Sequence, residues 1–181
     1  CICSAKAPVD CLPDGDPAEA VYSLPGREME ELPATDIQIL FFDIDGTLVD
    51  PRTGRISDKT KEALDRLRKA GRKLFIATGR PPASLPDLSQ IEFDGFITVN
   101  GSLCYTREEV IYHTPLSPEA VRKVIQNAAA LGRPVTVATR DRLSANGWDQ
   151  DLADYYRLAG LELTVDEHFE EACREDVYQM M

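Results

Sequence analysis

The sequence predicts an α/β protein in which the first ordered half builds a parallel sheet. Three apolar stretches, residues 39–42, 73–77 and 96–99, are strand candidates. A helical pattern over residues 58–70 separates the first two, and a proline-rich loop over residues 81–86 precedes the third. Strands that alternate with such connections are typical of a parallel sheet with right-handed crossovers.

Local patterns define the elements of this first half. Residues 39–42 are apolar at every position, which predicts a strand covered on both faces of the sheet. Ser57 or Asp58 is the expected N-cap of the helix, and Gly71 is its expected C-terminal stop. We assign residues 37–114 to this part of the chain.

The pattern then changes to that of a separate α+β unit, which we assign to residues 115–181. Ser117 and Pro118 are an N-cap and a first-turn proline, so they predict the start of a helix that ends at Gly132. A hairpin over residues 103–112 is expected just before this unit. The other elements expected within it are a strand over 134–138, a helix over 149–159, and strands over 161–165 and 177–181.

The first 36 residues differ from the rest of the chain. They hold eight acidic and two basic residues, which is −6 of the total charge of −11, and five of the twelve prolines. Their few large apolar side chains show no helical or strand period. Such a segment buries too little apolar area to offset the entropy lost on ordering, so we predict a mostly disordered leader over residues 1–36.

Composition excludes several classes of protein. A net charge of −11 argues against a nucleic-acid-binding surface, because phosphate backbones attract clustered Lys and Arg. No apolar run approaches the roughly 20 residues that span a bilayer. The five cysteines are scattered and odd in number, which favours reduced thiols and a cytoplasmic protein. The sequence does not predict an oligomeric state.

Two carboxylates directly after the first strand form the first candidate site, in the segment Asp43-Ile44-Asp45-Gly46-Thr47. In open α/β sheets, ligands bind beyond the carboxyl ends of the strands. Gly46 permits a sharp turn whose N–H groups can face an anion. Paired carboxylates in a small site need a proton or a cation between them, and Mg²⁺ suits carboxylates combined with a phosphate.

The next two strands end in polar residues as well. Thr78, Gly79 and Arg80 follow the second strand, and Asn100 follows the third. A hydroxyl, a glycine N–H and a guanidinium all bind phosphate oxygens. Three successive strands therefore end in residues suited to a joint anion and metal site.

Together these segments resemble the haloacid dehalogenase-like hydrolases, and among them the Cof-type (subclass IIB) phosphatases. The resemblance covers residues 37–181 and rests on D-x-D-G-T after an apolar strand, T-G-R after the second strand, and Asn100-Gly101 after the third. It implies a Rossmann-like parallel-sheet core, present here in its first part, with an inserted α+β cap. It also implies an Mg²⁺-dependent phosphatase of small phosphorylated metabolites, such as sugar phosphates.

The resemblance assigns roles to residues of this chain. Asp43 is the expected nucleophile that forms an aspartyl-phosphate, and Asp45 the expected proton donor and acceptor. Thr78 is expected to hold a phosphate oxygen during transfer. The expected Mg²⁺ ligands are the Asp43 carboxylate and the Asp45 backbone carbonyl. The residues expected to contact phosphate or substrate are Gly46, Thr47, Gly79, Arg80 and Asn100.

Two parts of the family pattern do not occur in the sequence. The pattern has a Lys after the cap and an acidic G-D-x-x-N-D-like segment, whereas no Lys follows Lys123 here. We therefore expect a truncated sequence, weak turnover by these 181 residues alone, and limited stability from an open sheet edge.

Other interpretations stay open at this point. A phosphomutase of the same superfamily shares the D-x-D-G-T opening and keeps the phosphoryl group. Another alternative is a non-catalytic fragment that binds metal and phosphate weakly. A last alternative is that Asp43 and Asp45 are plain turn residues. Tyr155 and Tyr156 are expected to pack on a helix face, with lining of a cap pocket as the alternative.

Overall fold

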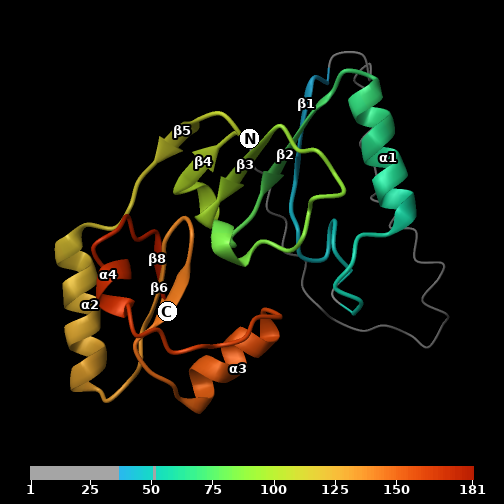
Figure 1. Cartoon of the computed structure of the whole chain (residues 1–181). Helices are drawn as coiled ribbons and strands as arrows, with labels where there is room; N and C mark the ends of the chain where they lie inside the picture. The colour runs from blue at the N-terminus through green and yellow to red at the C-terminus, as the bar shows by residue number, and fades with distance from the viewer. Residues whose placement is uncertain (1–36, 51) are drawn as a thin grey trace, which may run out of the picture. The chain divides into compact units, whose positions relative to one another are not determined.

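A computed structural model of the chain describes residues 37–50 and 52–181 (Figure 1). The predicted leader over residues 1–36 lies outside the described residues. In chain order the elements are β1 (Ile39–Phe42), α1 (Asp58–Lys69), β2 (Lys73–Ala77), β3 (Gly95–Thr98), β4 (Leu103–Tyr105), β5 (Val110–His113), α2 (Pro118–Ala130), β6 (Thr136–Ala138), β7 (Leu143–Ala145), α3 (Gln150–Leu158), α4 (Phe169–Ala172) and β8 (Gln179–Met180).

The first half forms a five-stranded sheet in the order β1-β2-β3-β4-β5. Strands β1, β2 and β3 are parallel, with Phe41 paired to Phe75 and Ile76 paired to Phe96. Strands β4 and β5 add an antiparallel hairpin at the β3 side. The predicted α/β class with a parallel sheet is therefore confirmed, and Figure 1 shows the five strands side by side.

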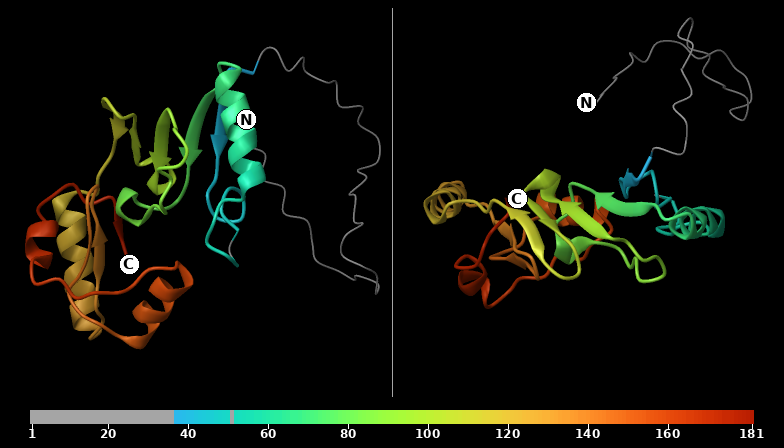
Figure 2. Two further views of the ribbon diagram at one scale, coloured as in Figure 1. Left: turned by 45° about the vertical axis from the view of Figure 1, so that its right-hand side comes forward. Right: turned by 90° about the horizontal axis from the view of Figure 1, so that it is seen from above.

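Helix α1 begins and ends where the sequence predicts. The Ser57 hydroxyl accepts a hydrogen bond from the Thr60 N–H at 3.1 Å, which satisfies one of the unpaired donors of the first turn. Gly71 has φ +78°, a left-handed conformation that ends the helix at little cost for glycine. Both views of Figure 2 place α1 beside β1, and Leu64 points into the core that β1 and β2 share.

Strand β1 is not covered on both faces, so that prediction is wrong. Leu40 and Phe42 pack against the core, but Ile39 and Phe41 are 47% and 56% exposed. The reason is that the core against which this strand packs lies on one face of the sheet only. Strand β1 is also the edge of the sheet, with no partner on its outer side among the described residues.

An open, partly apolar edge strand lowers cooperativity and favours association with other chains. We therefore expect the 181-residue chain to unfold over a broad temperature range. Circular dichroism during heating measures this, and a sharp two-state transition would contradict the expectation.

The second half forms its own three-stranded sheet in the order β7-β6-β8. Helix α2 packs against it through Val121, which meets Val135 and Val137 in a common core. The Ser117 hydroxyl caps α2 by accepting a hydrogen bond from the Ala120 N–H, as predicted. No described helix has the length and apolar character needed to cross a bilayer.

Several predicted elements in this half need correction. Residues 161–165 form no strand. Within this range, Val165 makes a single isolated bridge to Ala145. Strands β6 and β8 are shorter than the predicted 134–138 and 177–181, and β7 and α4 are absent from the prediction. Each of these pieces has two to four residues, too few to show a period in the sequence.

Candidate active site

Six of the eight predicted site residues line one cavity of about 530 Å³ at the carboxyl ends of β1 and β2. They come from three loops of the sheet: Asp43 and Asp45 after β1, Thr78, Gly79 and Arg80 after β2, and Asn100 after β3. The opposite side is formed by residues of β7, α3 and β8 and of the chain directly after α3 and β8. We call these residues the cap wall: Leu143, Tyr155, Tyr156, Leu158, Ala159, Leu161, Gln179 and Met181.

A tight loop after β1 presents the two carboxylates. Ile44 is fully buried, and its carbonyl accepts the N–H groups of Thr47, Leu48 and Val49 at 3.3, 3.1 and 2.9 Å. This burial anchors the loop, so its neighbours Asp43 and Asp45 are left exposed and line the cavity. No described residue donates a hydrogen bond to the Asp43 carboxylate, so its oxygens are available to a ligand.

The Asp45 carboxylate is held by Arg80 in a two-point ion pair. The Arg80 Nε donates to Asp45 Oδ2 at 2.8 Å, and Nη2 donates to Oδ1 at 2.9 Å. This hydrogen bonding lowers the pKa of Asp45 below its usual value, against the opposing effect of partial burial. It also raises the pKa of Arg80. Asp45 is therefore a fixed carboxylate in this conformation.

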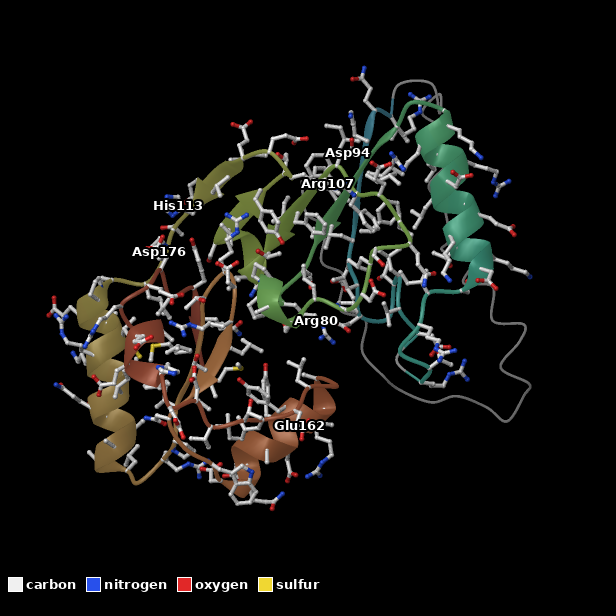
Figure 3. All side chains as sticks on the ribbon, in the orientation of Figure 1. Arg80, Asp94, Arg107, His113, Glu162 and Asp176 are labelled. Carbon is white, nitrogen blue, oxygen red and sulfur yellow. The ribbon has the colours of Figure 1, made fainter. Side chains whose placement is uncertain are left out.

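Arg80 also joins the sheet loops to α3. Its Nη1 donates to the Ser84 carbonyl at 3.0 Å, and its Nη2 donates to the Ala159 carbonyl at 3.2 Å, directly after α3. Figure 3 shows Arg80 at the end of the sheet that faces α3. With four hydrogen bonds made within the chain, the guanidinium holds protein groups here, whereas the sequence predicts a contact to substrate.

Backbone hydrogen bonds join the loops that carry Thr78 and Asn100. The Val99 N–H donates to the Arg80 carbonyl at 3.1 Å, and the Asn100 N–H donates to the Thr78 carbonyl at 3.2 Å. Val99 and Asn100 have φ +49° and +54°. For a β-branched residue this left-handed conformation costs about 1–3 kcal/mol. The left-handed conformation at Val99 also ends β3 at Thr98, one residue earlier than predicted.

The Asn100 side chain lies close against Gly79. A Cβ on Gly79 would meet the Asn100 Oδ1 at 3.1 Å, so the side chain would have to move. The buried Thr78 accepts the Arg80 N–H on its hydroxyl oxygen at 3.2 Å, which leaves the hydroxyl proton free to be donated into the cavity.

Gly46 and Thr47 are the two predicted residues that do not line the cavity. The Gly46 N–H donates to the Val49 carbonyl at 3.1 Å, and the Thr47 N–H donates to the Ile44 carbonyl. Both donors therefore stabilise the loop itself. Gly46 has φ +77°, so its contribution is the left-handed turn between the second carboxylate and the rest of the loop.

The cap wall agrees with the alternative expectation for Tyr155 and Tyr156, and Tyr155, which is half exposed, does not pack as first expected. The other residues of this wall have no counterpart in the sequence prediction. Tyr156 is buried as expected for a residue on the packed face of α3, but it also lines the cavity, as does Tyr155. The sequence contains one signal for this wall, which is the helical spacing of Tyr155 and Leu158. This spacing puts two apolar side chains on a face of α3 that the core does not cover.

Asp43 and Asp45 supply oxygen atoms, which are the ligands that a hard cation such as Mg²⁺ prefers. No cluster of three or more His, Cys, Asp or Glu side chains suited to a metal occurs within residues 37–50 and 52–181. Mg²⁺ commonly takes only one or two protein carboxylates, and water and a substrate phosphate complete its shell. The Asp43 carboxylate, to which no described residue donates a hydrogen bond, fits such a site.

Sequence comparison relates the chain to a hydrolase family and to two proteins that are named as phosphatases. Residues 40–181 match the profile of the haloacid dehalogenase-like hydrolases. The chain is 33% identical over 111 residues to "Putative phosphatase YkrA" of Bacillus subtilis (strain 168), covering 61% of this chain and 43% of that protein. It is 37% identical over 89 residues to "HMP-PP phosphatase" of Klebsiella pneumoniae (strain 342), covering 48% of this chain and 32% of that protein.

Solved structures agree with the sequence matches. The HAD subclass IIB sugar phosphatase BT4131 superposes with a TM-score of 0.66 at 36% identity, covering 79% of this chain and 57% of that one. A hypothetical protein from Geobacillus kaustophilus HTA426 gives 0.70 at 32% identity, covering 79% and 56%. The chain thus spans about half the length of these relatives. On these grounds, the chain belongs to the haloacid dehalogenase-like hydrolase family, in its Cof-type (subclass IIB) branch.

Proposed function

We propose that the protein is an Mg²⁺-dependent phosphatase that hydrolyses small phosphorylated metabolites through an aspartyl-phosphate at Asp43. The observation that carries the proposal is the position of the Asp43 carboxylate. It lies exposed at the carboxyl end of β1, lines the cavity and accepts no hydrogen bond from a described residue. Family membership and the phosphatase names of the relatives support the same reaction class.

The reaction proceeds in two balanced steps on this chain's own residues. An Asp43 oxygen attacks phosphorus, the bond from phosphorus to the alcohol oxygen breaks, and the protonated form of Asp45 gives that oxygen its proton. Water then attacks the phosphorus of the acyl phosphate while the Asp45 carboxylate accepts a proton, which releases inorganic phosphate and restores Asp43. The ion pair with Arg80 favours the carboxylate form that the second step uses and disfavours the protonated form that the first step uses.

Other residues orient the phosphoryl group. Thr78 and Asn100 both line the cavity, and a hydroxyl and an amide are groups that can donate to a phosphoryl oxygen. Mg²⁺, held by the Asp43 carboxylate and the Asp45 backbone carbonyl, supplies positive charge that offsets the negative charge of the transferring group.

The test of the proposed function is direct detection of the covalent intermediate. After incubation with acetyl phosphate and Mg²⁺, we expect intact-mass spectrometry to show one phosphoryl adduct, and peptide mapping after mild work-up to place it on Asp43. Hydroxylamine should remove the adduct, because it cleaves acyl phosphates. An adduct on another residue, or none at all, would overturn the proposal.

A phosphomutase would form the same adduct, so product analysis separates the two activities. With a hexose phosphate as substrate, a phosphatase releases inorganic phosphate and free sugar. A mutase instead returns an isomeric hexose phosphate. We expect inorganic phosphate as the product.

A further inference from the structure

The C-terminal end of α3 is connected to Asp45 through Arg80. Ala159 directly follows α3, and its carbonyl accepts a hydrogen bond from Arg80 Nη2 at 3.2 Å. The same nitrogen donates to Asp45 Oδ1 at 2.9 Å. One guanidinium nitrogen therefore joins the cap wall to the carboxylate to which we assign proton transfer.

The planar guanidinium makes these two contacts depend on each other. The two N–H bonds of Nη2 lie in one plane at a fixed angle, so a partner that fixes one of them also sets the direction of the other. Nη1 of Arg80 is held in addition by the Ser84 carbonyl at 3.0 Å. Two main-chain carbonyls from distant parts of the chain thus hold the guanidinium in the orientation in which it donates to both oxygens of Asp45.

The Asp45 carboxylate depends on this guanidinium for its position. The Asp45 side chain is 54% exposed, whereas the Arg80 side chain is 22% exposed. Within residues 37–50 and 52–181, Arg80 is the only basic side chain that forms an ion pair with Asp45. Small displacements of a reacting group lower the rate of the reaction steeply, so the orientation of Arg80 should matter for the step that uses Asp45.

Gly160 determines where the Ala159 carbonyl points. Gly160 has φ +71°, and the N–H groups of Gly160 and Leu161 donate to carbonyls in the last turn of α3 at 3.0 and 2.8 Å. This pattern is a Schellman motif, which ends a helix at a residue in the left-handed conformation. The Ala159 carbonyl lies at this helix end, where carbonyls lack partners within the helix and where the dipole favours a cation.

We infer that the end of α3 is a positioning element for the proposed reaction: the Ala159 carbonyl, set by the turn at Gly160, orients Arg80 and thereby the Asp45 carboxylate. This inference rests on the proposed function and adds Ala159 and Gly160 to it as positioning residues. It gives the second half of the chain a part in the proton-transfer step. Asp45 accepts a proton from water when the acyl phosphate is hydrolysed, so a displaced Ala159 carbonyl should slow that step.

Gly160→Val tests the inference on the hydrolysis step. A β-branched residue is strained in the left-handed conformation, so the turn and the Ala159 carbonyl should shift. After labelling with acetyl phosphate and Mg²⁺, intact-mass spectrometry should show that the phosphoryl adduct is lost about tenfold more slowly than in the unmodified protein. Formation of the adduct should be unchanged, because acetate leaves as a stable anion and needs no proton from Asp45. Gly160→Asn should restore the rate of loss, since Asn tolerates this conformation.

Gly132→Val is the matched control for this change. Gly132 ends α2 with φ +64°, and the N–H groups of Gly132 and Arg133 donate to carbonyls in the last turn of α2 at 3.0 and 2.9 Å. A Cβ would meet no atom within 4 Å at either glycine, so the two substitutions introduce the same kind of strain. No residue of α2 lines the cavity, and we therefore expect adduct loss at the rate of the unmodified protein.

A double-mutant cycle separates positioning through Arg80 from a general structural effect. In the Arg80→Met background, Gly160→Val should slow adduct loss by less than about twofold, because the link to Asp45 is already removed. Equal slowing in both backgrounds would overturn the inference, as would unchanged adduct loss in Gly160→Val or an equal fall in adduct formation. If Gly160→Val loses the circular dichroism of the folded protein, Gly160→Ala, which carries less strain, replaces it with the same outcomes.

These outcomes are distinct from a failure of the proposed function. Each of them presupposes that the adduct forms on Asp43 in the unmodified protein, so each leaves the phosphatase proposal intact. Absence of the adduct on Asp43 in the unmodified protein overturns both the proposed function and the role of the end of α3.

Discussion

Asp43→Asn should abolish formation of the aspartyl-phosphate and lower turnover of p-nitrophenyl phosphate by about 10⁴-fold or to the detection limit. The amide has nearly the shape of the carboxylate but is a far weaker nucleophile and a poorer ligand for Mg²⁺. The Asp43 side chain is exposed and accepts no hydrogen bond from a described residue, so the fold should be unaffected. Rates and intact-mass spectra of both proteins measure the effect.

Asp50→Asn is the matched control for this change. Asp50 is a carboxylate of the same loop region, but it pairs with Arg52 and does not line the cavity. We expect the Asp50→Asn variant to form the phosphoryl adduct to the same extent as the unmodified protein. Retention of the adduct in Asp43→Asn, or its loss in Asp50→Asn, would mean that another group is the nucleophile.

Arg80→Met should lower kcat about a hundredfold, with a smaller change in KM, because Asp45 then loses both hydrogen bonds that fix its carboxylate. Arg80→Lys should recover only part of the rate, since an ammonium group cannot donate to both carboxylate oxygens in the planar geometry of a guanidinium. This result would make Arg80 a positioning residue, because a purely structural role would not give such a partial rescue. Steady-state kinetics on p-nitrophenyl phosphate provides both constants.

Arg52→Met removes a similar ion pair elsewhere in the chain and serves as the control. Arg52 donates to Asp50 through Nε and Nη2 at 3.3 and 3.2 Å, but the pair lies outside the cavity. Its loss should change kcat by less than about twofold, in keeping with the small energies of exposed ion pairs. If Arg80→Met raised KM and left kcat intact, Arg80 would instead bind substrate.

Much of the first half of the fold follows from the sequence because its signals are local. Ser57 and Gly71 mark the two ends of α1, and the apolar runs at 39–42 and 73–77 predict two parallel strands. The short pieces are different. Strand β7 is held by its pairing to β6, and α4 by packing of Phe169 into the core of the second half. Neither contact is visible in a window of three or four residues.

The candidate site divides in the same way. The order of residues after each strand places Asp43, Thr78 and Asn100 at one edge of the sheet, because parallel strands end at the same edge. Sequence reasoning also assigns Arg80 to the substrate, and here the structure differs. Its guanidinium is engaged by Asp45 and by the Ala159 carbonyl, 79 positions away in the chain.

By itself, the sequence determined the α/β class, the helix ends and the loops that carry the reactive carboxylates, since each depends on neighbouring residues. Only the tertiary structure decided what faces those carboxylates. Contacts between segments far apart in the chain decide the partner of Asp45, the exposure of one face of β1 and the composition of the cap wall. Such contacts form only when burial of apolar area brings these segments together, so no local pattern records them.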